Sequence, residues 1–325
     1  MKILVTLPVH DRHKTALKAA APQAEFFFTP PGEVTDEQLG EVAAVIGNIS
    51  PSRLRGFENI RWVQLNSAGT DGYTDAGVLA SGAVLTNSTG AYGLAISEHM
   101  IGQLLMQIKR LGQYYDAQKK KAWSDFGTVG SIWNSTTLVV GLGDIGGEFA
   151  RKMKALGSHV IGIRRHMGER PDYLDEAATL DELDELLPRA DFVALCLPGT
   201  GATWHLFDES RLRQMKKGAI LLNVGRGTAV DSYALCEALH SGHLGGACID
   251  VVEPEPLPKE HPLWEAPNLL LTPHVSGFYH LPETFERVVR IAVANLEAFG
   301  AGRPLKNQVD LAVGYRRNED DNKAL

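Results

Sequence analysis

Cysteine, blocks of like charge and long apolar runs are all scarce in this 325-residue chain, and each scarcity excludes a class of protein. The three cysteines, Cys196, Cys236 and Cys248, are scattered, so we expect reduced thiols rather than disulfides. No Cys/His cluster has zinc spacing, and we predict no metal site. The formal net charge of −7 and the lack of a polybasic block argue against a nucleic-acid partner.

Long hydrophobic segments are missing as well. No run of about 18 apolar residues occurs, so we expect no membrane-spanning helix. The opening MKILVTLPVH has too short an apolar stretch for the core of a signal peptide. We therefore expect a cytoplasmic protein. With 44% hydrophobic residues, the chain is long enough for two domains with their own cores.

The first hundred residues alternate short apolar runs with helical or turn patterns, as in an α/β fold. The predicted strands are 2–7, 24–29, 42–47, 61–66 and 83–87. Residues 94–118 then predict one long amphipathic helix, which either joins two domains or belongs to a core. Its apolar residues at helical spacing are Ile96, Met100, Leu104, Ile108 and Leu111.

The βα alternation restarts in the second half, with strands that are apolar nearly throughout. Such strands are typical of a parallel sheet that is covered on both faces. A helix follows over 282–300, and the charged tail 316–325 is expected to fray. The pattern predicts two α/β domains, one inserted into the other. The predicted strands of the inserted domain are 137–142, 159–163, 191–197, 219–224, 246–251 and 269–272.

A glycine turn follows the first of these strands. In VVGLGDIGG, Gly141, Gly143 and Gly146 form G-x-G-x-x-G between a strand and a helix, with Asp144 and Ile145 between the glycines. Glycine permits a tight turn and a close approach of the backbone to a pyrophosphate, and the helix N-terminus attracts its charge. The turn predicts dinucleotide binding, and the alternative is a plain βα connection.

The next strand ends in VIGIRRH, where a dinucleotide fold usually presents a carboxylate to the ribose. Arg164 and Arg165 stand there instead, and the next acidic residue is Glu169. Arginine binds a 2′-phosphate, whereas a carboxylate repels it. We therefore predict that NADP(H) is preferred and NAD(H) possible. The alternative is two solvated surface arginines.

Three later strands are followed by residues that suit acid–base chemistry. Arg226 follows AILLNV, Asp250 ends GACID with Glu255 just beyond it, and His274 follows LLLTP. An arginine for a carboxylate, a histidine to move a proton and a glutamate to orient it form a coherent set. Taken singly, each residue also fits a role without chemistry. Arg226 could be a surface charge, Glu255 a loop residue and His274 a turn histidine.

These ordered blocks resemble the D-isomer-specific 2-hydroxyacid dehydrogenase family, which includes glyoxylate/hydroxypyruvate reductases and phosphoglycerate dehydrogenases. The resemblance extends from WVQLNSAGTDGY to GRPLKNQVD. It implies a Rossmann-type doubly wound parallel sheet domain over 99–282, inserted into a flavodoxin-like substrate domain over 1–98 and 283–325. It also implies a homodimer.

By position, Arg226 matches the substrate-binding arginine, Glu255 the glutamate partner and His274 the acid/base of the family, and Asp250 the residue near the nicotinamide carboxamide. The substrate-binding candidates are Ser67, Ala68, Gly69, Arg226 and His274. The cofactor-binding candidates are Gly141, Gly143, Asp144, Ile145, Gly146, Arg164, Arg165, Leu197, Pro198, Thr203, Val224, Gly225, Asp250, Ser276 and Gly277.

The sequence thus predicts an oxidoreductase that transfers hydride between NADP(H) and a small 2-oxoacid or D-2-hydroxyacid. One alternative is a nucleotide-sensing, corepressor-like binding protein of the same fold, although the chain lacks long disordered extensions. Another is formate dehydrogenase, but that family has a glutamine where Glu255 stands.

Overall fold

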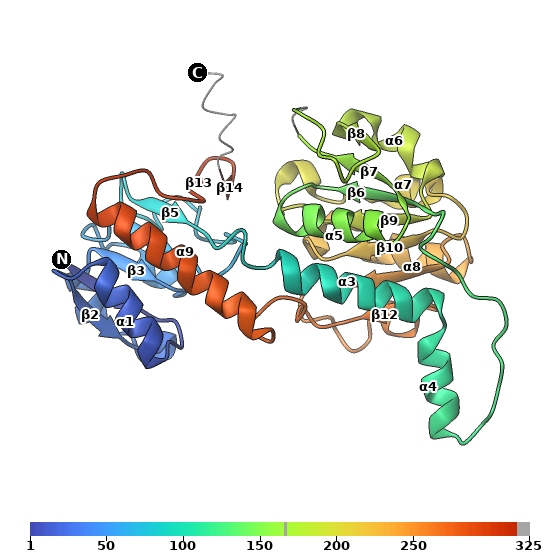
Figure 1. Cartoon of the computed structure of the whole chain (residues 1–325), viewed down its shortest axis with the longest axis horizontal. Helices are drawn as coiled ribbons and strands as arrows, with labels where there is room; N and C mark the ends of the chain where they lie inside the picture. Colours follow the sequence, from blue (N-terminus) through green and yellow to red (C-terminus); the bar gives the residue numbers. More distant parts are fainter. Residues whose placement is uncertain (166–167, 317–325) are drawn as a thin grey trace. The chain divides into compact units, whose positions relative to one another are not determined.

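The computed structural model describes residues 1–165 and 168–316, so the charged tail predicted over 316–325 lies outside them except for Arg316. The chain divides into two compact units, Met1–Tyr92 with Tyr279–Leu325 and Gly93–Phe278 (Figure 1). The sequence-based boundaries at 98/99 and 282/283 fall inside helices, because the chain passes between the units just before each helix begins.

The first unit contains a parallel sheet of order β2-β1-β3-β4-β5, the flavodoxin-like order that was predicted. All of its predicted strands are confirmed: β1 (Lys2–Val5), β2 (Glu25–Phe28), β3 (Ala44–Ile46), β4 (Trp62–Gln64) and β5 (Val84–Thr86). Its other elements are α1 (Asp11–Ala20), η1 (Pro31–Glu33), α2 (Asp36–Glu41), η2 (Pro51–Leu54), α9 (Pro282–Gly300), β13 (Val309–Asp310) and β14 (Tyr315–Arg316).

Helix α9 returns to this sheet from the far end of the chain. Its Phe299 ring lies 5.0 Å from the Trp62 ring of β4, and its Asn295 Nδ2 donates to Gln64 Oε1 at 2.7 Å. Trp62 and Asn295 are fully buried, so these contacts belong to the core. They explain why residues after 278 fold with the first ninety.

The second unit contains a parallel sheet of order β12-β11-β10-β9-β6-β7-β8. In chain order this is the Rossmann arrangement, whose direction reverses between β6 and β9. The predicted strands are confirmed, but β8 was missed because its sequence EAA has no apolar run. The strands are β6 (Thr136–Val140), β7 (His159–Ile163), β8 (Glu176–Ala178), β9 (Phe192–Leu195), β10 (Ile220–Asn223), β11 (Gly246–Ile249) and β12 (Leu269–Leu271).

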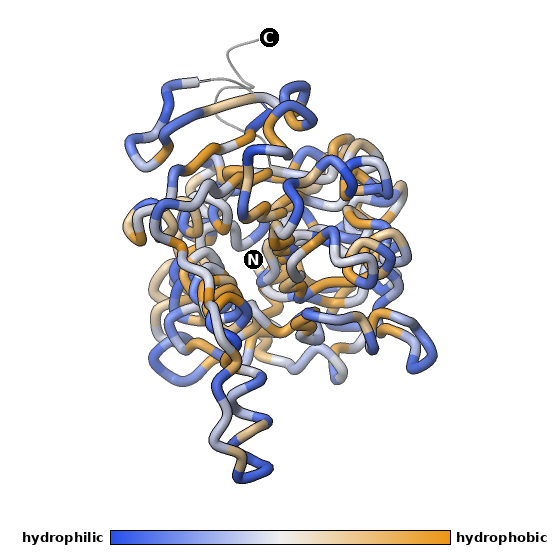
Figure 2. Tube along the Cα trace, turned by 90° about the vertical axis from the view of Figure 1, so that its right-hand side faces the viewer, coloured by the Kyte–Doolittle hydropathy of each residue, from blue (hydrophilic) through white to orange (hydrophobic). Residues whose placement is uncertain are grey.

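Helices cover both faces of this sheet. Leu138 and Val140 of β6 join a buried cluster with leucines of α6–α8, whereas Val139 between them lies toward Gly146 of α5. The residues of the central strands are buried almost throughout, and Figure 2 colours each residue of the chain by its hydropathy. The helices are α3 (Gly93–Ile108), α4 (Leu111–Lys119), α5 (Asp144–Ala155), α6 (Leu183–Leu186), α7 (Glu209–Gln214) and α8 (Ser232–His240), with η3 (Leu180–Glu182), η4 (Leu187–Arg189), η5 (Gly201–Thr203), η6 (Gly227–Ala229) and η7 (Pro262–Glu265).

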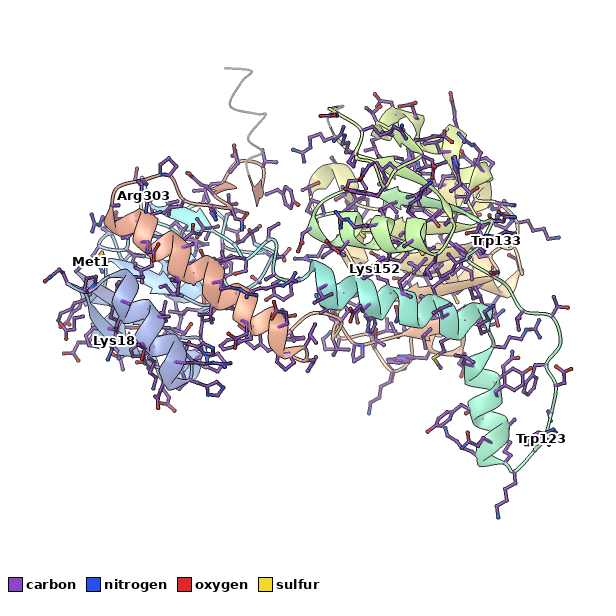
Figure 3. The ribbon with its side chains drawn as sticks, viewed as in Figure 1. Met1, Lys18, Trp123, Trp133, Lys152 and Arg303 are labelled. Atoms are coloured by element: carbon purple, nitrogen blue, oxygen red, sulfur yellow. The ribbon has the colours of Figure 1, made fainter. Side chains whose placement is uncertain are left out.

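The single helix predicted over 94–118 is wrong. It breaks after α3, where Arg110 adopts a left-handed conformation (φ +56°) before α4 begins. Ile96, Met100, Leu104 and Ile108 are buried, but Leu111 is 51% exposed. The apolar stripe therefore ends at Ile108, and α4 projects away from the sheet with Trp123 beyond its end (Figure 3).

The cysteines are free, as predicted. Burial raises the pKa of Cys248 to about 12, which keeps this thiol protonated and unreactive. Across residues 1–165 and 168–316, no helix has the length and hydropathy that crossing a membrane requires.

Candidate active site

The glycine turn lies at the reversal point of the second sheet. Gly141 has φ +99°, and a Cβ there would be 2.8 Å from the Cys196 carbonyl oxygen. A Cβ on Gly146 would be 1.9 Å from the Gly141 carbonyl oxygen. Only glycine fits either position, so the turn stays narrow and the N-terminus of α5 stays accessible to a phosphate. The turn fits a dinucleotide.

Gly143 is the N-cap residue of α5, and Asp144 begins the helix. The Asp144 carboxylate accepts a hydrogen bond from Gly93 N at 2.8 Å, at the start of α3. This contact links α3 to the glycine turn and engages one carboxylate oxygen.

Arg164 directly follows β7. Its Nη2 donates to the Glu169 carbonyl at 2.8 Å, while its Nε is buried with no hydrogen-bond partner in the described part of the chain. A buried donor without an acceptor is unfavourable, and a phosphate oxygen would satisfy it. Arg165, the next residue, is exposed. His166 and Met167 lie outside the described residues.

The loops after β9 and β10 approach each other closely. A Cβ on Gly225 would be 2.5 Å from the Leu197 carbonyl oxygen, so the Val224–Gly225 and Leu197–Pro198 segments touch. Thr203 Oγ1 donates to the Pro198 carbonyl at 2.8 Å and fixes this loop. The structure brings these cofactor candidates together at the same sheet edge as the glycine turn.

Asp250 organises the end of β11. It is 1% exposed, and its carboxylate accepts hydrogen bonds from Thr272 Oγ1 (2.5 Å), Val275 N (3.0 Å) and Ser276 N (3.0 Å). The carboxylate therefore fixes the backbone on both sides of His274. Ser276 and Gly277 follow in the same segment.

His274 and Glu255 form the central pair. His274 Nδ1 lies 2.8 Å from Glu255 Oε2, while Glu255 Oε1 accepts from Val252 N at 3.0 Å. The backbone of His274 is left-handed (φ +52°), and its N–H donates to the Asp250 carbonyl at 2.8 Å. The imidazole is half exposed, and Nε2 has no partner within the described residues. Glu255 thus orients the ring through Nδ1, and Nε2 is left to contact a substrate.

Arg226 follows β10 at the same edge. Its side chain is partly buried, with Nη1 donating to the Gly225 carbonyl at 2.8 Å. Asn223 Nδ2 donates to the Arg226 carbonyl at 3.0 Å, and Gly199 offers space beside the arginine stem. These contacts fix the backbone from which the Arg226 side chain extends.

The loop at Ser67–Gly69 belongs to the first unit. In the described residues the N–H groups of Ser67, Ala68 and Gly69 have no acceptor, whereas the carbonyl oxygens of residues 66–69 all accept hydrogen bonds. Such a run of free N–H groups is an anion-binding feature. The donors to the carbonyls are, in chain order, Tyr92 Oη, Ser88 N, Asn87 Nδ2 and Ser67 Oγ.

Residues 101–276 match the family model described as "D-isomer specific 2-hydroxyacid dehydrogenase, NAD binding domain". The chain belongs to this family. It is an oxidoreductase of the 2-oxoacid and 2-hydroxyacid class, with a nicotinamide-binding domain of Rossmann type.

The similarity of this 2-hydroxyacid dehydrogenase family member to its relatives extends over most of the chain. A glyoxylate reductase of Korarchaeum cryptofilum is 30% identical over 296 residues, 87% of each protein. A family structure from Aeromonas salmonicida subsp. salmonicida is 33% identical, with a TM-score of 0.84 over 95% of this chain and 99% of that one. An NADPH-dependent glyoxylate/hydroxypyruvate reductase of Sinorhizobium meliloti, solved with NADP and sulfate, is 26% identical, with a TM-score of 0.80 over 97% and 99%. These relatives do not favour a corepressor-like binding protein.

Sequence reasoning missed the residues that hold the segment before His274 in place. Thr272 Oγ1 donates to Asp250 and also lies 3.1 Å from His99 Nε2 and 3.2 Å from Gln103 Nε2 of α3. The signal was present: His99 and Gln103 are polar residues four positions apart on a helix with many apolar residues. Its meaning depended on which strand the helix covers.

Proposed function

We propose that this dehydrogenase reduces small 2-oxoacids with NADPH in preference to NADH, through Arg226, Glu255 and His274. The observation that carries the proposal is the 2.8 Å His274–Glu255 pair on the sheet edge that bears the glycine turn. A reduced nicotinamide supplies hydride to the carbonyl carbon when it is bound at that edge.

In the proposed mechanism, His274 moves the proton. Nδ1–H is held by Glu255, so Nε2 carries the proton that passes to the ketone oxygen as the alcohol forms. The carboxylate of Glu255 stabilises the imidazolium before this step. Oxidation of the hydroxyacid reverses the transfer, with neutral His274 as the base.

Two features serve to bind the substrate carboxylate. The guanidinium of Arg226 offers a planar pair of donors that match a carboxylate. In the first unit, the free N–H groups of Ser67–Gly69 offer donors of the same kind. The cofactor candidates at the glycine turn and the loops after β9, β10 and β12 bind the dinucleotide, and Arg164 and Arg165 bind its 2′-phosphate.

The proposal is tested by following NADPH oxidation with glyoxylate and hydroxypyruvate. Arg226→Ala should raise KM for the oxoacid about 10- to 100-fold and also lower kcat, because a charged hydrogen bond contributes about 1.5–3 kcal/mol and the clamp also orients the ketone. Arg226→Lys keeps the charge without the fork and should recover only part of the loss. An unchanged KM in Arg226→Ala would show that Arg226 does not bind the substrate carboxylate.

A second test concerns the Glu255 side chain. In the proposed mechanism, the negative charge of Glu255 stabilises the imidazolium of His274. Glu255→Gln removes that charge and should lower kcat for ketone reduction about ten- to a hundredfold, since a charged hydrogen bond contributes about 1.5–3 kcal/mol. Glu253→Gln, in the same loop, should leave kcat unchanged. An unchanged kcat in Glu255→Gln contradicts the pairing.

We also propose that the protein is a cytoplasmic homodimer. In support, α4 and the segment after it carry exposed apolar side chains that a second copy would cover. Sedimentation equilibrium of the wild type measures the assembly directly. The exposed side chains are Leu111, Tyr115, Trp123, Val129 and Trp133.

A further inference from the structure

The first unit contains a pocket of about 470 Å³ at the carboxyl ends of β1, β2 and β3. Its size lies within the range of small-molecule sites. Most of its lining is apolar, and Leu7, Val9, Phe28, Pro30 and Tyr279 contribute to it. It therefore suits an uncharged, hydrophobic group.

The pocket shares a wall with the loop proposed to hold the substrate carboxylate. Asn66 lines the pocket and directly precedes Ser67–Gly69. Its Oδ1 accepts from Asn48 N at 2.6 Å, and Asn48 Oδ1 accepts from Asn66 N at 3.0 Å. This reciprocal pair fixes the wall. A molecule held by the loop thus has the pocket beside it.

Tyr279 closes another part of the wall. Its hydroxyl is hydrogen-bonded to the Asn66 side chain, and burial raises the pKa of Tyr279 to about 12. The phenol therefore stays neutral at working pH. Its ring also lies edge-on to Phe285 of α9, with 4.9 Å between ring centroids. These contacts hold the ring in place and keep the wall free of negative charge.

Lys14 is the one charged residue in the pocket lining, among the residues that the structure describes. Its Nζ lies 5.5 Å from the centre of the Phe28 ring and 3.8 Å from the Asp11 carboxylate. The charge is thus already met by an aromatic face and an acidic neighbour. This favours an apolar occupant over a second carboxylate.

We propose that the pocket binds the side chain of the 2-oxoacid, and that the preferred substrates carry a branched aliphatic or aromatic side chain. The inference rests on the proposed function, because the carboxylate must be held at Ser67–Gly69. Glyoxylate has only a hydrogen at that position and would leave the pocket to water. Burying a side chain of leucine or phenylalanine size favours binding by about 10- to 150-fold.

The test compares kcat/KM with NADPH for glyoxylate, oxaloacetate, 4-methyl-2-oxopentanoate and phenylpyruvate. In the wild type, the last two should exceed glyoxylate at least tenfold, and oxaloacetate should not. Val9→Trp fills the pocket and should lower the ratio of phenylpyruvate to glyoxylate efficiency at least tenfold. Val313→Trp, an exposed position outside the lining, should leave that ratio unchanged. Pro30→Trp provides a second filling variant, and circular dichroism checks the fold of each.

The outcomes separate this inference from the proposed function. If glyoxylate is reduced as well as phenylpyruvate, or Val9→Trp and Pro30→Trp both leave the ratio in place, the side-chain pocket is overturned and the reductase stands. A preference for oxaloacetate also overturns it, in favour of an anionic side chain at Lys14. If no oxoacid is reduced, the proposed function fails. Calorimetric titration with phenylpyruvate then decides the pocket alone, since binding that Val9→Trp weakens tenfold supports it and no binding overturns it.

Discussion

Replacing His274 with alanine should lower kcat for ketone reduction by about 10²–10⁴, the usual contribution of a positioned general acid. The reason is that His274 supplies the proton in the proposed mechanism, with its ring oriented by Glu255 at 2.8 Å. NADPH binding, measured by fluorescence titration, should change little because the glycine turn is untouched. Stopped-flow measurement of NADPH oxidation gives the rate.

The left-handed backbone at His274 calls for a second variant. His274→Asn suits this conformation better than alanine, because asparagine is enriched there, yet it cannot donate a proton as an imidazolium does. Both variants should lose activity to a similar degree. His240→Ala, on the exposed end of α8, is the matched control and should retain the wild-type rate. Near-normal turnover in His274→Asn would show that the proton comes from elsewhere.

The ratio of kcat/KM with NADPH to that with NADH should favour NADPH in the wild type and fall about 10²-fold or more in Arg164→Asp. The wild-type arginine has a buried Nε that lacks an acceptor, in the described part of the chain, and a 2′-phosphate supplies one. Losing a charged hydrogen bond costs about 1.5–3 kcal/mol, or ten- to a hundredfold. The aspartate adds repulsion of the phosphate and accepts a hydrogen bond from a free 2′-hydroxyl.

Two controls separate cofactor recognition from a general charge effect. Arg165→Ala should weaken NADPH binding without improving NADH binding, since it removes attraction and adds no acceptor. Arg213→Asp makes the same charge change on the exposed surface of α7 and should leave the ratio unchanged. A wild-type preference for NADH, or a ratio equally insensitive at residues 164 and 213, would make these arginines solvated surface charges.

The sequence by itself determined the apolar strands and the glycine turn. Buried parallel strands such as Leu138–Val140 must be apolar on both faces, so their pattern is visible without knowledge of any partner. Gly141 and Gly146 are likewise local requirements, because their neighbours lie within a few residues or on the adjacent strand. Arg226, Glu255 and His274 could be chosen as candidates because parallel strands all end at the same sheet edge.

Only the tertiary structure decided which of these residues meet and how. Glu255 and His274 stand nineteen residues apart, and Asp250 supports their contact by accepting hydrogen bonds from residues on both sides of His274. The helix breaks after α3 because no buried core lies beside Leu111 among the described residues. The helical spacing of Leu111 in the sequence does not reveal this. Strand β8 forms because Ile161 and Ile163 of β7 offer it an edge, although EAA has little strand preference of its own. Long-range pairing supplies free energy that local sequence does not encode, and there the sequence ceased to predict the structure.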